Sequence, residues 1–149
     1  MPDYISLVPT AIAFLDSALP EGETIGNGIE LGTKVITLDV VRDGVEQITE
    51  ALASRSNIKS IHIISHGSPA SLQLSAIDLN LTNLKTYVKK LQRWSRSLAD
   101  SAEILLYGWD VVAGEKGANF VQQLSQLTKA KIAASRSPIG SSAIIQAFA

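Results

Sequence analysis

The sequence predicts an α/β fold, a three-layer α/β/α sandwich built around a mainly parallel sheet. Five apolar runs have the length of β-strands, and helical patterns fill most of the gaps between them. The runs are almost continuously apolar, which is typical of parallel strands that are buried on both faces and joined by right-handed crossovers. A chain of 149 residues suits one domain, so we expect a single domain over residues 1–149.

The predicted strands each end near glycine, aspartate or serine. They are Ala11 to Leu15, Lys34 to Leu38, Ile61 to Ser65, Glu103 to Tyr107 and Lys131 to Ala134. After the third strand, residues 71–79 read SLQLSAIDL and alternate apolar and polar side chains on either side of Ser75 and Ala76. This alternation predicts a small β-hairpin insertion around 71–79.

Helices are predicted in the connections between the strands. Asp43, followed three residues later by Glu46, resembles a capping box, and it precedes an apolar face of Val45, Ile48, Ala51 and Leu52. Glu21 to Leu31 is predicted to form a short first helix, and Glu115 to Thr128 a later one.

A longer helix is predicted to begin near Thr82. Apolar residues recur along it at helical spacing, namely Leu84, Val88, Leu91 and Leu98. Five basic residues occupy its other faces, namely Lys85, Lys89, Lys90, Arg93 and Arg96. We interpret this basic run as a solvated helix face.

Composition excludes several classes of function. Thirteen basic and fourteen acidic residues give a net charge of −1, so no strong field attracts nucleic acid or an anionic membrane. The chain has no cysteine, which excludes disulfides, thiolate metal sites and thiol catalysis. The N-terminal apolar stretch lacks the basic region of a secretory signal, which favours a cytoplasmic protein, while export as part of a larger system stays open.

Ligands of open α/β sheets bind beyond the carboxyl ends of the strands, so the residues that follow each strand form the candidate cleft. These candidates are Asp16, Ser65, His66, Gly67, Ser68, Gly108, Trp109, Asp110, Ser135 and Arg136. His66 is the strongest of them, because an imidazole titrates near neutral pH and suits proton transfer. A surface or capping role for His66 is the alternative.

A metal site is not expected. His62 and His66 have the spacing of a helical chelate, but on a strand four residues span about 13 Å. We expect His62 to be packed with its ring nitrogens hydrogen-bonded. No cofactor is predicted either.

Two hydrophobic blocks carry a resemblance to a known group of proteins. One ends in His-Gly (SIHIISHG) and the other in Tyr-Gly followed by Trp-Asp (AEILLYGWD). They resemble the clan of caspases, gingipains and legumains, whose fold is a relative of the flavodoxin-like one. More closely, nearly the whole chain is similar to a domain of unknown function found in large bacterial, notably cyanobacterial, repeat and adhesin-like proteins.

The resemblance implies a catalytic dyad that this chain does not complete. In the family, Tyr-Gly is usually followed by a nucleophilic cysteine, whose base is the histidine of Ser-His-Gly. Those positions are Trp109 and His66 here, and an indole has no nucleophile for covalent attack. Arg136 and Ser137 stand where the resemblance implies acidic residues, so a pocket for a cationic side chain is not expected.

The leading hypothesis is therefore a catalytically silent caspase-like domain that acts as a binding or assembly module for a protein or peptide. The chain ends in SSAIIQAFA where the family continues into a further strand, so a homodimer through an exposed edge strand is one form of assembly. The rival hypothesis is a hydrolase of peptide or ester bonds that uses His66 with Ser68, Ser135 or Asp110. An aspartate after a strand more often caps a turn or helix, which is the structural interpretation of Asp110.

Overall fold

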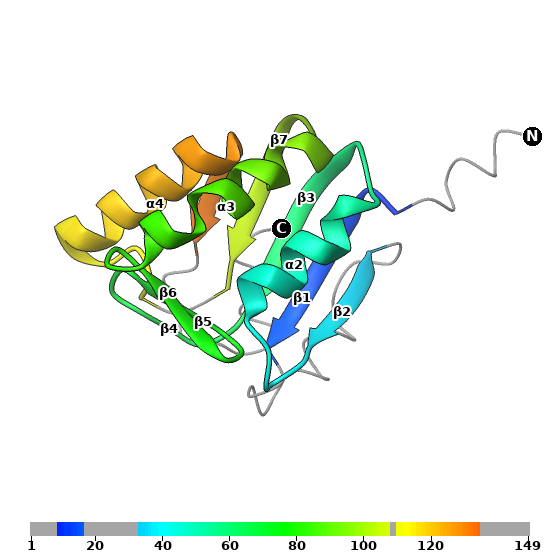
Figure 1. Cartoon of the computed structure of the whole chain (residues 1–149). Helices are drawn as coiled ribbons and strands as arrows, with labels where there is room; N and C mark the ends of the chain where they lie inside the picture. The colour runs from blue at the N-terminus through cyan, green and yellow to red at the C-terminus, as the bar shows by residue number, and fades with distance from the viewer. Residues whose placement is uncertain (1–8, 17–32, 108–109, 135–149) are drawn as a thin grey trace, which may run out of the picture.

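The computed structural model describes residues 9–16, 33–107 and 110–134, and these contain a five-stranded parallel sheet (Figure 1). The strand order is β2-β1-β3-β7-β8. The strands are β1 (Ala11–Asp16), β2 (Lys34–Leu38), β3 (Ile58–Ile64), β7 (Leu98–Leu106) and β8 (Lys131–Ala134). The predicted α/β fold with a parallel sheet is confirmed.

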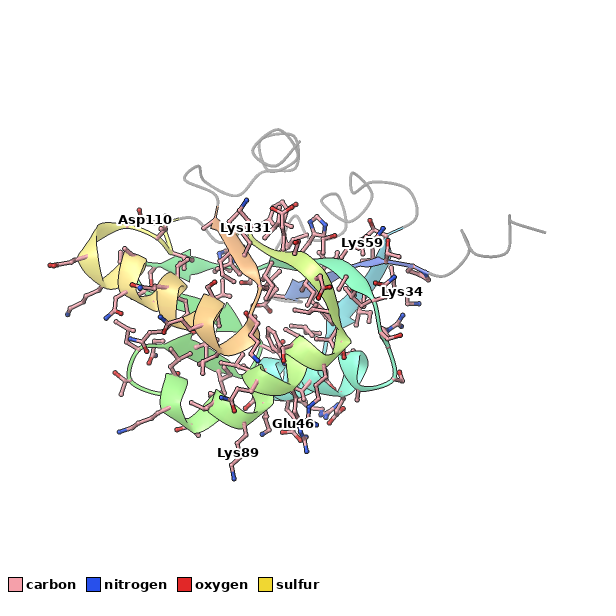
Figure 2. The ribbon with its side chains drawn as sticks, turned by 90° about the horizontal axis from the view of Figure 1, so that it is seen from above. Lys34, Glu46, Lys59, Lys89, Asp110 and Lys131 are labelled. Atoms are coloured by element: carbon pink, nitrogen blue, oxygen red, sulfur yellow. The ribbon has the colours of Figure 1, made fainter. Side chains whose placement is uncertain are left out.

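Three helices, α2 (Gly44–Ala53), α3 (Val88–Trp94) and α4 (Gly114–Thr128), pack side by side on one face of this sheet (Figure 1). Seen from above, Glu46 of α2 and Lys89 of α3 point away from the sheet (Figure 2). The apolar core between the helices and the sheet includes Ile12, Phe14, Ile61, Ile63, Ile104 and Leu106. The predicted first helix, residues 21–31, lies outside the described residues.

The central strands are buried on both faces. Ala13 and Leu15 alternate with the core residues of β1, and Ile64 and Leu105 occupy the same face of β3 and β7. All four are buried. This pattern explains why the strands read as continuous apolar runs rather than as alternating ones.

The start of α2 is fixed by a cap and a close contact. Asp43 Oδ1 accepts hydrogen bonds from the backbone N–H groups of Val45 and Glu46 at 2.8 and 3.2 Å, which satisfies two donors of the first helical turn. Its Oδ2 accepts a hydrogen bond from the Tyr87 hydroxyl at 2.6 Å. A Cβ on Gly44 would lie 2.5 Å from Leu74 O, so this position has room only for glycine.

The helix predicted from Thr82 to Leu98 is shorter than expected. A 3-10 turn, η2 (Leu84–Tyr87), precedes α3, and a second one, η3 (Ser95–Ser97), follows it. Leu98 does not belong to the helix: it begins β7 and pairs with Ile58. The chain turns here because Ser97 Oγ donates to Leu52 O at 2.6 Å and the indole of Trp94, which is buried, donates to Thr49 Oγ1 at 2.8 Å.

Both β3 and β7 start earlier than predicted. Polar residues such as Lys59 and Asp100 interrupt the apolar pattern there, yet the strands already pair. Between two pairs, Ile58 with Leu98 and Ser60 with Glu103, β7 advances further than β3. Ser101 has a φ of +63° in this segment, which marks a bulge in β7.

The predicted hairpin is present as part of a three-stranded antiparallel sheet. Its strands are β4 (Gly67–Ser68), β5 (Ser71–Leu74) and β6 (Ile77–Asn80). Leu72, Leu74 and Leu79 point into the core, which leaves the intervening polar residues on the outer face. Ala70 N donates to Val111 O at 2.9 Å, so this small sheet is tied to the segment that precedes α4.

Candidate functional site

The carboxyl ends of β1 and β3 flank the point where the sheet changes direction. The chain leaves β1 for β2 on one side, whereas from β3 it continues to β7 and β8 on the other. Ligands of open α/β sheets bind at such a topological switch point. The structure therefore places Asp16, the last residue of β1, and Ser65, the residue after β3, at the expected location.

Asp16 and Ser65 are brought together but are both buried. Leu15 pairs with Ile64, so the next residue of each strand also lies alongside the other. Asp16 is 1% exposed and Ser65 is 0% exposed. Ser65 Oγ donates to the carbonyl of His66 at 3.4 Å, which directs this hydroxyl toward the backbone. We assign both residues to the support of the site, because a solvent-borne substrate cannot reach them.

His66 has the opposite character. Its side chain is exposed, and within the described residues its ring makes no hydrogen bond. Its backbone is fixed, because the carbonyl of His66 accepts a hydrogen bond from Gln73 N at 2.9 Å. The chain thus holds the main chain of His66 against β5 and presents the imidazole to solvent.

A pocket of about 210 Å³ surrounds this imidazole. It is lined by His66, Gly67, Ser68, Ser71, Gln73 and Asp78. Gln73 pairs with Asp78, and Ser68 pairs with Ser71, so these side chains share the outer face of the small sheet. The structure confirms that His66, Gly67 and Ser68 lie together.

Ser71, Gln73 and Asp78 were missed by the sequence interpretation. The alternating pattern of 71–79 contains the necessary signal, because the apolar residues of this hairpin must face the core and the polar ones must share the other face. What the sequence did not supply is the pairing of this hairpin with Gly67 and Ser68, which places that polar face beside His66.

Asp110 is separate from this pocket. It is half-buried, has a φ of +72°, and its carbonyl accepts a hydrogen bond from Ala113 N at 3.1 Å. Asp110 therefore forms the turn into α4 (Figure 2), as the structural interpretation expected, although it does so through its backbone. Gly117 packs this turn closely, since a Cβ there would lie 2.7 Å from Val111 O.

Four of the predicted site residues cannot be placed. Gly108, Trp109, Ser135 and Arg136 lie outside the described residues. The C-terminal segment SSAIIQAFA, to which the expected edge strand belongs, lies outside them as well.

His62 forms a second polar pair, on the sheet face opposite the helices. Its Nδ1 lies 2.7 Å from the Tyr107 hydroxyl, and its Nε2 lies 3.4 Å from Ser60 Oγ. Tyr107 N donates to Ile63 O at 2.8 Å, which fixes the end of β7 against β3. Burial raises the pKa of Tyr107 to about 12. The expectation that His62 has hydrogen-bonded ring nitrogens is confirmed.

In the described ranges, no three His, Cys, Asp or Glu side chains are grouped so that they could hold a metal ion. The helices of these ranges include none that is long and apolar enough to cross a membrane.

Comparison with known proteins identifies one family. Residues 12–146 match the model described as "Domain of unknown function (DUF4347)". No curated protein matches the sequence. Among solved structures, the chain is similar to a short chain dehydrogenase family protein from Francisella tularensis subsp. tularensis SCHU S4, with 14% identity and a TM-score of 0.38. The alignment covers 80% of this chain and 61% of that one, so the chain spans about three fifths of the solved structure.

Proposed function

We propose that this chain, which belongs to the DUF4347 family of domains of unknown function, is a catalytically silent module that binds a protein or peptide segment at the His66 pocket. The observation that carries the proposal is the contrast within His66 itself, a fixed backbone and an exposed ring that faces a polar pocket. A side chain that is held in place without internal partners is ready to bind an external one.

The chemistry of the pocket suits a peptide. The His66 ring, the hydroxyls of Ser68 and Ser71, the Gln73 amide and the Asp78 carboxylate all donate or accept hydrogen bonds. Together they match the alternating N–H and C=O groups of an extended segment. The pocket contains no apolar side chain, so we expect specificity from hydrogen bonds rather than from a buried apolar anchor.

The absence of catalysis rests on the sequence. A caspase-like dyad needs a thiolate, and the chain has no cysteine and carries Trp109 at the matching position. A caspase-like ancestry is supported by the order of the strands, because the blocks that end in His66 and Tyr107 belong to the adjacent parallel strands β3 and β7. In such an arrangement the residues after both strands share one edge of the sheet.

A hydrolase remains the second candidate, because the structure places His66, Ser68 and Asp78 in one pocket. In that mechanism His66 would accept the proton of the Ser68 hydroxyl as Ser68 Oγ attacks a peptide or ester carbonyl. The buried Ser65 is excluded from this role, and Asp110 does not line the pocket.

A single pair of proteins separates the candidates. Wild type and His66→Ala are screened against a displayed peptide library for binding and against fluorogenic peptides and esters for turnover. We expect peptides that bind wild type and not His66→Ala, with no turnover by either protein. Turnover that disappears in both His66→Ala and Ser68→Ala would replace the binding module by the hydrolase. If wild type neither binds nor turns over any probe, the pocket has no function of this kind.

A further inference from the structure

The exposed large apolar side chains of the described ranges gather in one short segment. They are Val35 on β2 and Val40 and Val41 in the turn that follows, at 38%, 56% and 77% exposure. Single exposed apolar residues are ordinary on protein surfaces, but a cluster within seven residues of sequence marks a contact surface. This segment lies at the β2 side of the sheet, away from α4 and β8 (Figure 1).

The turn that carries Val40 and Val41 is held firmly. Gln47 Oε1 accepts a hydrogen bond from Asp39 N at 2.7 Å, and Gln47 Nε2 donates to the carbonyls of Asp39 and Arg42 at 3.0 and 3.1 Å. Val41 N donates to Asp39 Oδ1 at 3.1 Å. The two valines are therefore displayed in a fixed geometry, so little conformational entropy is lost when a partner covers them.

The strand before this turn is an edge of the sheet. Within the described part of the chain, β2 pairs with β1 alone, which leaves the N–H and C=O groups of its other side available. Its sequence, KVITL, has three adjacent β-branched residues and no proline. Natural edge strands usually carry proline, a bulge or several charges that prevent pairing, and β2 has a single lysine at its start.

We propose that β2 pairs in antiparallel fashion with β2 of a second copy of this chain, about a two-fold axis normal to the sheet. The charges of the segment favour this partner and this direction. Lys34 begins the strand and Asp39 follows its end, so antiparallel pairing brings each lysine close to the aspartate of the other copy. Parallel pairing would instead place Lys34 against Lys34.

The same arrangement covers the exposed valines. The end of β2 in one copy lies beside the start of β2 in the other, so Val40 and Val41 can pack against the methylene groups of the second copy's Lys34. Because the two-fold axis keeps the faces of the two sheets aligned, the pairing is centred on one residue, Ile36 or Thr37, which then lies opposite itself. This dimer is independent of the His66 pocket and of its proposed ligand.

Sedimentation across micromolar to millimolar concentrations tests the association. We expect a concentration-dependent dimer for wild type and a monomer for Thr37→Lys, because the new charge lies on the exposed face of the edge strand. The control Gln122→Lys adds the same charge on the exposed side of α4 and should dimerise as wild type does. A wild type that stays monomeric throughout, or a dimer that Thr37→Lys leaves intact, would overturn the proposal.

Cross-linking tests the geometry. The chain has no cysteine, so a single introduced thiol can form a disulfide only between two copies. Directly opposed residues of an antiparallel pair have Cα atoms about 4.5 to 5.5 Å apart, which suits a disulfide. We expect either Ile36→Cys or Thr37→Cys to oxidise rapidly to a covalent dimer, and Lys89→Cys on α3 to do so far more slowly. Equal slow oxidation of all three variants would rule out the β2 pairing.

Discussion

His62 and His66 lie on or just beyond the same strand, yet the structure uses them in opposite ways. The ring of His62 is hydrogen-bonded to Tyr107 across two strands, whereas the ring of His66 is exposed and only its backbone is fixed. The strand explains the difference. His62 lies within the sheet, where a polar group must find a partner, and His66 follows the strand end, where the chain turns into β4. We therefore assign stability to the first histidine and binding to the second.

The largest effect should come from the support of the His66 pocket rather than from either histidine. In Gly44→Ala the new Cβ would lie 2.5 Å from Leu74 O, so α2 and β5 must move apart. We expect a loss of about 2 to 3 kcal/mol in the free energy of unfolding, measured by urea denaturation. Peptide binding should weaken too, because β5 carries Ser71 and Gln73. Gly114→Ala, where the added Cβ meets no atom within 4 Å, is the matched control for added volume and tests only the cost of its φ of +71°.

His62→Ala should be the next most damaging change. It leaves the buried Tyr107 hydroxyl without its imidazole partner and opens space on that face of the sheet. We expect a loss of about 2 kcal/mol of stability in the same denaturation experiment. The folded fraction should still bind the peptides that wild type binds. If stability is unchanged, the His62–Tyr107 contact has no structural value.

Tyr107→Phe should cost less, because it removes one hydroxyl and keeps the ring. We expect about 1 kcal/mol, and a double-mutant cycle with His62→Ala should show that the two losses are not additive. Additive losses would mean that the hydrogen bond between the two side chains contributes nothing.

The same tyrosine should make stability depend on alkaline pH. Burial raises the pKa of Tyr107 to about 12 from an ordinary value of 10.0, so the folded chain holds this proton more tightly than the unfolded chain does. The stabilising contribution is complete below pH 10 and is lost as the pH rises toward 12. Tyr87 behaves in the same way, because burial and then its hydrogen bond to Asp43 raise its pKa to about 12. Unfolding curves in this range should be flatter with pH in Tyr107→Phe, and an unchanged slope would contradict the assignment.

The smallest effect on stability is expected for His66→Ala. No internal hydrogen bond of the described residues is lost, and the exposed ring covers little surface. We expect a change within about 0.5 kcal/mol, together with the loss of peptide binding.

The sequence was most informative where an apolar run is bounded by polar residues or turns. The bounds of Lys34–Leu38 and Lys131–Ala134 agree with the structure to the residue. It was least informative where a polar residue lies inside a strand, as in the early part of β7, and where a helix ends without a glycine or proline, as after Trp94. Leu98 fitted the helical spacing, but its pairing with Ile58 decided its structure.

Only part of the site could be predicted for the same reason. His66, Gly67 and Ser68 are neighbours in sequence at a strand end, so their position was accessible. Gln73 and Asp78 join them through strand pairing, and His62 meets Tyr107 across forty-five positions of sequence. Such contacts depend on which strands are adjacent, and local patterns do not specify that order.

The most direct test compares the two histidines in one experiment. Stability and peptide binding are measured side by side for His62→Ala and His66→Ala, with binding expressed per folded molecule. The account requires that His62→Ala loses stability and keeps binding, while His66→Ala keeps stability and loses binding. If His66→Ala binds as wild type does, or if it unfolds as readily as His62→Ala, the division between a structural and a binding histidine is wrong.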